Sequence, residues 1–130
     1  MLFRFKAFHV AALSLALGAP AHAHGLPTRV GACAITRIEE VGTRLVDGSN
    51  EPVPDSGSAV SFTNGGYQVS YDTVPAIVHS RKGDPVRMCL VSIPRGCPKG
   101  DNRGREYKTT NLRTHKTWRL PDSQHMCGGA

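Results

Sequence analysis

Basic side chains are concentrated in the last third of this 130-residue chain, and they have the clearest chemical potential of any group in it. The segment 95–119 contains two acidic residues against eight basic ones: Arg95, Lys99, Arg103, Arg105, Lys108, Arg113, Lys116 and Arg119. The segment 39–72 has the opposite balance, with six acidic residues and one basic residue. Guanidinium and ammonium groups bind phosphate and carboxylate. The pattern therefore predicts an acidic partner, such as a cell-envelope polymer, a lipid head group or a nucleic acid.

The predicted contact residues combine cations with one aromatic ring that could stack on a ligand. They are Arg103, Arg105, Lys108, Arg113, Lys116 and Trp118. Arg103 and Arg105 are the preferred contacts because the surrounding sequence, GDNRGR, is typical of an exposed loop. The alternative is that these charges are solvated or paired within the fold. Trp118 belongs to the core instead if the last hairpin forms.

His24 offers a second chemistry. If the chain is cleaved after Ala23, the new amine and the His24 ring together form a chelate suited to Cu(II), and His79, His115 or His125 could supply a further imidazole. The segment 24–130 contains no His-x-His pair. An ordinary frayed terminus is the alternative, and the sequence predicts no resident cofactor.

A small secreted hydrolase is a third possibility, with weaker motifs. The chain has no G-x-S-x-G sequence, and a catalytic triad is recognised by its geometry. A ribonuclease-like site needs a histidine, a carboxylate and an arginine that converge. The candidate sets are Ser80 with His79 and Asp84, Ser123 with Asp122 and His125, and His115 or His125 with Glu106 and Arg113.

The segment 1–23 has the form of a secretory signal peptide. Arg4 and Lys6 precede an apolar stretch at 10–19, and Ala21-His22-Ala23 provides small residues at the cleavage site. The apolar stretch is too short to span a bilayer as a mature helix, and no later segment could do so. We expect a periplasmic or secreted protein whose residues 24–130 form a single domain.

The four cysteines, Cys33, Cys89, Cys97 and Cys127, predict two disulfides in an exported chain. A zinc site would require closer pairs than these. Extended chain between Cys89 and Pro94 makes a bridge to Cys97 strained. Of the three possible connectivities we favour Cys33–Cys89, which would tie the N-terminal strand to the central one, and Cys97–Cys127, which would pin a loop to the C-terminal tail.

Alternating apolar residues and turn signals predict an all-β domain, a small barrel or sandwich of about six to eight short antiparallel strands. The predicted strands are 30–38, continued by 39–46 after a bend, then 58–63, 67–74, 76–80, 86–93, 107–111 and 117–120. Asn64-Gly65-Gly66 predicts a hairpin.

Two of these strands carry predictions about their faces. The strand 86–93 is apolar on both faces, which predicts a central strand covered on both sides. In 67–74, Tyr67, Val69 and Tyr71 alternate with Gln68, Ser70 and Asp72, the pattern of a half-exposed strand.

Three stretches, CLVSIPRGCP, GDNRG and LPDSQHMCGGA, resemble small exported bacterial proteins that have no assigned activity. The resemblance extends from about Cys33 to the C-terminus. It implies export and a single β domain, and it supplies no reaction, ligand or catalytic residue. The sequence as a whole favours an exported, non-enzymatic binding or interaction module.

Overall fold

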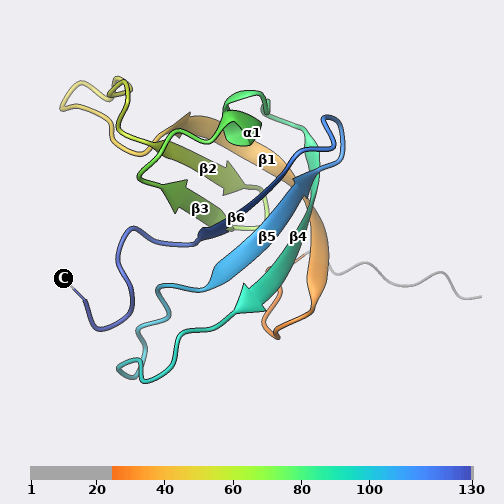
Figure 1. Cartoon of the computed structure of the whole chain (residues 1–130), viewed down its shortest axis with the longest axis vertical. Helices are drawn as coiled ribbons and strands as arrows, with labels where there is room; N and C mark the ends of the chain where they lie inside the picture. The colour runs from red at the N-terminus through yellow and green to blue at the C-terminus, as the bar shows by residue number, and fades with distance from the viewer. Residues whose placement is uncertain (1–24, 130) are drawn as a thin grey trace, which may run out of the picture.

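The computed structural model describes residues 25–129 (Figure 1). Within them the chain forms six strands and one short helix. In chain order these are β1 (Cys33–Thr43), β2 (Ser58–Phe62), β3 (Tyr67–Ser70), α1 (Pro75–Val78), β4 (Pro85–Ser92), β5 (Glu106–Asn111) and β6 (Thr117–Pro121). The predicted signal peptide and His24 lie outside the described residues. None of the helical structure in 25–129 has the length and apolar character needed to cross a membrane.

All six strands belong to one antiparallel sheet with the order β3-β2-β1-β4-β5-β6. The sheet curls so that its two edge strands, β3 and β6, approach each other and form a half-barrel (Figure 1). β1 joins the two halves, because its first part pairs with β4 and its second part pairs with β2. A register shift between Ile38 and Glu40 marks the change, at the bend that the sequence predicts. The all-β prediction is confirmed.

The concave side of the sheet holds the core. Alternate residues of each strand turn inward and are almost fully buried, as a period of two requires. The buried cluster consists of Ile38, Val60, Phe62, Ile77, Val86, Met88, Leu90, Tyr107 and Trp118.

The prediction that β4 is covered on both sides is wrong. Its inward residues Val86, Met88 and Leu90 are fully buried, but Arg87 on the other face is exposed and Ile93, just beyond the strand, is 41% exposed. A single curled sheet has one core, so the second apolar face of this stretch remains at the surface.

The Gln68 side chain links the two edges of the half-barrel. Its side chain is fully buried, which reverses the prediction that it lies on a half-exposed face. The amide nitrogen donates to the carbonyls of Tyr107 and Leu120, at 2.7 and 3.1 Å. The amide oxygen accepts from the Thr109 hydroxyl and the Trp118 indole, at 2.6 and 2.8 Å. One side chain of β3 is therefore hydrogen-bonded to both β5 and β6, across the seam where the sheet does not close.

The segment predicted as a strand at 76–80 is helical instead. Pro75 occupies the first turn of α1, where its fixed φ suits a helix and its missing N–H is not needed. Ile77 is fully buried and packs into the core. Ser80 follows the helix, and its hydroxyl donates to the Ala76 carbonyl. The helix therefore covers one end of the half-barrel.

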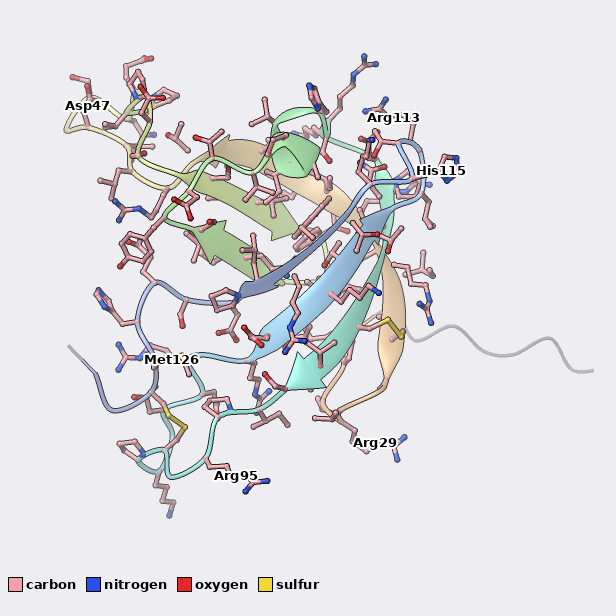
Figure 2. The ribbon with its side chains drawn as sticks, viewed as in Figure 1. Arg29, Asp47, Arg95, Arg113, His115 and Met126 are labelled. Carbon is pink, nitrogen blue, oxygen red and sulfur yellow. A yellow bond between two sulfur atoms is a disulfide. The ribbon has the colours of Figure 1, made fainter. Side chains whose placement is uncertain are left out.

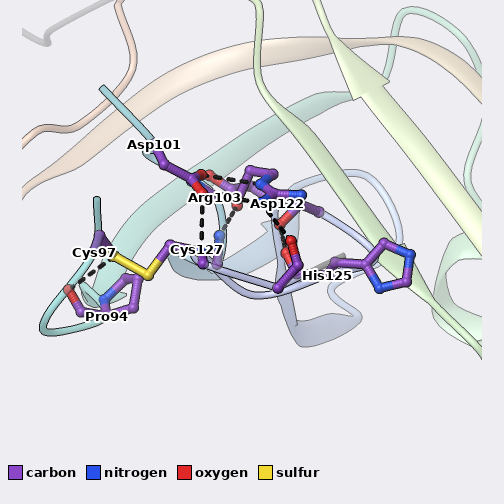
Figure 3. Close-up of a disulfide and its surroundings, with 11 residues drawn as sticks. Pro94, Cys97, Asp101, Arg103, Asp122, His125 and Cys127 are labelled. Carbon is purple, nitrogen blue, oxygen red and sulfur yellow. Dashed lines mark hydrogen bonds and ion pairs between the residues drawn. A yellow bond between two sulfur atoms is a disulfide. The ribbon is translucent and has the colours of Figure 1, made fainter. Parts of the chain in front are cut away.

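Both predicted disulfides are present. Cys33–Cys89 links directly opposed residues of β1 and β4. Cys97–Cys127 ties the loop after β4 to the C-terminal tail (Figure 3). Each bridge stabilises the fold by restricting the unfolded chain. Two disulfides in a domain of this size are typical of an oxidising compartment.

The Asp84 carboxylate fastens the loop after α1 to the turn between β5 and β6. Arg113 donates to it with Nε and Nη2, at 2.7 and 2.9 Å. The side chain of Asn111 and the backbone N–H of Arg81 also donate to it. These bonds, led by those from Arg113, hold the pKa of Asp84 well below its usual range.

Asp84→Asn is expected to reduce stability at neutral pH by about 1–2 kcal/mol, a modest value because the Arg113 side chain is 38% exposed and screened by water. Since the folded state lowers the pKa of Asp84, its contribution is present above about pH 4 and is lost as the pH falls. Urea unfolding at several pH values measures the difference, which should shrink towards pH 3. Asp72→Asn, at an exposed position, is the control. A constant difference down to pH 3 would contradict this account.

Candidate functional site

Four cations lie on the convex face of the sheet, each on a different strand. They are Arg37 on β1, Arg87 on β4, Lys108 on β5 and Arg119 on β6, and all four are exposed. We call this group the basic face. Each cation alternates along its strand with a buried residue, such as Val86 and Met88 on either side of Arg87. The alternation that builds the core therefore also places the charges outward.

The strand register brings these cations close together. Lys108 lies directly opposite Arg119, and Arg87 is diagonal to Lys108 because its own partner is Thr110. Directly opposed side chains on neighbouring strands have Cβ atoms about 5 Å apart, and like charges at such positions destabilise a sheet. The close spacing of these positive charges therefore does not itself stabilise the sheet.

Glu106 neutralises one member of the basic face. It accepts from Nη2 of Arg119 at 2.8 Å and from the Ser92 hydroxyl at 3.1 Å. The hydrogen bond from Arg119 lowers the pKa of Glu106, so the carboxylate stays charged at neutral pH. In the described part of the chain, Arg87 and Lys108 take part in no ion pair. They are therefore the cations of this face that remain available to a ligand.

The predicted contact residues do not form one surface in the structure, because they lie in different environments. Lys108 lies on the basic face, and Lys116 is exposed in the turn that leads into β6. Arg105 is half-buried on the loop before β5. Trp118 is 5% exposed and bonded to Gln68, so it belongs to the core and offers no ring for stacking.

The preferred contact Arg103 is held in a structural network with the C-terminal tail (Figure 3). Its guanidinium donates twice to Asp101, each time at 2.9 Å, and once to the Gly129 carbonyl at 3.1 Å. Asp101 also accepts from the N–H of Gly128. Arg113 likewise forms an ion pair with Asp84. These two arginines fix loops to the body of the fold, and their charge is already compensated.

Two members of the basic face, Arg37 and Arg87, lie outside the segment from which the contacts were predicted. Arg87 sits between buried residues in a strand with period two, so an outward direction could have been read from the sequence. That it lies beside Lys108 depends on which strands pair and in which register, which one sequence does not reveal. Arg37 is partly engaged, since its Nη1 donates to the Gly83 carbonyl at 2.8 Å.

The acidic residues of the segment 39–72 lie on β1 and on the loops that follow β1 and β3. Asp47 marks a loop that projects from the ends of β1 and β2, far from Arg29 and Arg95 (Figure 2). A hollow of about 300 Å³ lies beside this loop, lined among others by Glu40, Ala59 and Tyr67. Its lining residues come from β1, β2 and β3 and from the loop after β1, whereas Arg87, Lys108 and Arg119 lie on β4, β5 and β6.

The two candidate catalytic sets that contain a serine do not assemble, and in the third set Glu106 is paired with Arg119 while Arg113 is paired with Asp84. The Ser80 hydroxyl is buried, donates to the Ala76 carbonyl and accepts from Asn111, so it is not poised as a nucleophile. The Ser123 hydroxyl donates to the backbone of His125 rather than to a base.

The histidines in the described part of the chain belong to no group that could hold a metal ion. His115 lies at the end of the molecule opposite to the C-terminal tail that carries His125 (Figure 2). Across residues 25–129, no group of three or more His, Cys, Asp or Glu side chains is arranged to hold a metal ion. The copper prediction concerns His24, which the structure does not describe.

Comparison of the chain with models of protein families, with curated proteins and with solved structures gives no match.

Proposed function

We propose that this protein is an exported binding module that recognises a polyanion through its basic face. The observation that carries the proposal is the placement of Lys108 opposite Arg119 and diagonal to Arg87 on the convex side of the sheet. Arg87 and Lys108 are in none of the ion pairs within residues 25–129, and closely spaced cations of this kind create a positive potential that attracts and orients an acidic ligand. A non-catalytic role agrees with the sequestered hydroxyls and carboxylates described above.

The basic face would bind a polyanion through charge and hydrogen bonds, because it offers no exposed aromatic ring. Trp118 and Tyr107 are buried, so stacking on aromatic rings does not contribute. Arg87 and Lys108 offer charge-assisted hydrogen bonds from long, exposed side chains. Recognition of this kind depends on charge density rather than on a particular sugar or base. It should weaken as salt screens it, with a Debye length of about 8 Å at physiological ionic strength.

Retention on immobilised heparin over a salt series tests the proposal. Arg87→Ser combined with Lys108→Ser should weaken heparin binding about tenfold, because two unpaired cations are lost. The matched control is Arg81→Ser with Lys82→Ser, which removes the same charges from the exposed turn before β4, at the Arg37 end of the basic face and outside the group of Arg87, Lys108 and Arg119. Equal retention of the two double variants would show that net charge alone drives binding and would contradict a defined face.

A further inference from the structure

A second surface, next to the basic face, combines cations with exposed aliphatic side chains. Val30 is 60% exposed and Ile93 is 41% exposed. The cations Arg29 and Arg95 flank them in the sequence, and both are exposed. We call these four residues the amphipathic tip.

The pairing of β1 with β4 brings the two halves of the tip together. The N–H of Gly31 donates to the Leu90 carbonyl at 2.9 Å, and the N–H of Leu90 donates to the Ala32 carbonyl at 3.0 Å. The N–H of Ala32 donates to the Arg29 carbonyl at 3.0 Å, so residues 29–32 form a turn that lies against Leu90, three residues before Ile93. Arg29 and Arg95 lie at the same end of the molecule (Figure 2).

Two acidic groups on the segments that follow the tip in the chain are already compensated. Glu106 lies opposite Ser92 at the end of β4 and is paired with Arg119. Asp101, in the loop that follows the tip, is paired with Arg103. Arg29 and Arg95 are absent from the ion pairs within 25–129. The tip therefore presents two aliphatic side chains between two uncompensated cations.

This combination matches the interface of an anionic bilayer. Cations near a membrane surface are attracted by acidic phospholipid head groups, and aliphatic side chains gain by entering the acyl boundary beneath them. A soluble polyanion such as a polysaccharide would use the cations but would gain little from Val30 and Ile93. The aliphatic residues thus distinguish a membrane from other acidic ligands.

We infer that the amphipathic tip docks the protein onto the surface of a membrane rich in anionic phospholipid, with Val30 and Ile93 entering the interface and the basic face lying against the head groups. The inference rests on the proposed function, because it identifies the polyanion as a lipid surface. Arg87 and Lys108 would attract the protein to the membrane over a longer range, and Val30 and Ile93 would insert into the interface.

Co-sedimentation with vesicles tests the inference. The full chain is produced in an exporting host, and the intact mass of each recovered variant is recorded so that proteins with the same N-terminus are compared. The vesicles are equimolar phosphatidylglycerol and phosphatidylcholine, with pure phosphatidylcholine as the uncharged reference. Val30→Ser with Ile93→Ser should bind the anionic vesicles at least about tenfold more weakly than the parent. Its retention on heparin should not change.

The matched control is Val46→Ser with Val78→Ser, which removes two valines of similar exposure, 55% and 56%, away from the tip. It should bind the vesicles like the parent. If the parent binds heparin but no vesicle, the lipid inference is overturned and the proposed function stands. Equal vesicle binding by the tip variant and the parent also overturns it. A parent that binds neither heparin nor vesicles overturns both proposals.

Discussion

Gln68→Leu is expected to destabilise the fold by about 3–5 kcal/mol, although the replacement has a similar volume and is apolar. The substitution leaves the Trp118 indole N–H and the Thr109 hydroxyl buried without their acceptor. It also removes the donor from two carbonyls on β5 and β6. Each buried polar group left unpaired costs about 1–3 kcal/mol, and bonds that share one amide reinforce one another. The midpoint of urea unfolding measures the effect.

Gln124→Leu is the matched control for this experiment. Gln124 also uses its amide group, accepting from Arg44 at 2.9 Å, but it lies on the half-buried tail. Water can replace that bond, so the change should be below about 1 kcal/mol. Equal effects of the two substitutions would show that Gln68 does not hold the seam between β3 and β6.

Leu90→Ala is expected to destabilise the protein by about 2–4 kcal/mol. Leu90 is fully buried on β4, an interior strand of the sheet, and belongs to the core cluster. Its truncation leaves a cavity that packed neighbours cannot refill. Chemical denaturation compares it with Leu112→Ala, a leucine that is 40% exposed in the turn after β5. A parent-like midpoint for Leu90→Ala would show that β4 is peripheral to the core.

Much of the fold could be predicted because it depends on local pattern. Short apolar stretches bounded by turn signals locate β2, β4, β5 and β6, and Asn64-Gly65-Gly66 marks the turn between β2 and β3. The strain in a Cys89–Cys97 bridge, which is also visible locally, excludes one of the three possible disulfide pairings. Such features depend on neighbours within a few residues, which a sequence displays directly.

The errors have tertiary causes. Gln68 looks like a surface residue because its neighbours alternate as in a half-exposed strand, yet the curl of the sheet turns it towards β5 and β6. Ile93 looks like a core residue because it is apolar, yet the single curled sheet offers nothing to cover it. The helix α1 was missed because four residues are too few to display a period of 3.6, although Pro75 was a local signal for a helix start.

The candidate site was predicted only in part for the same reason. The excess of basic residues in 95–119 is visible in the sequence, and Lys108 belongs to it. Which of these cations are already compensated is not visible, and Arg103 and Arg113 prove to be engaged by Asp101 and Asp84. Arg87 could be placed beside Lys108 only once the register of β4 and β5 was known.

The central claim is that the convex side of β4, β5 and β6 is a polyanion-binding surface. NMR titration of the ¹⁵N-labelled protein with a heparin-derived oligosaccharide tests it most directly. We predict that the largest backbone amide shift changes occur around Arg87, Lys108 and Arg119. Little change is expected in the acidic loop that contains Asp47. Shift changes centred on that loop, or spread evenly over the surface, would contradict the claim.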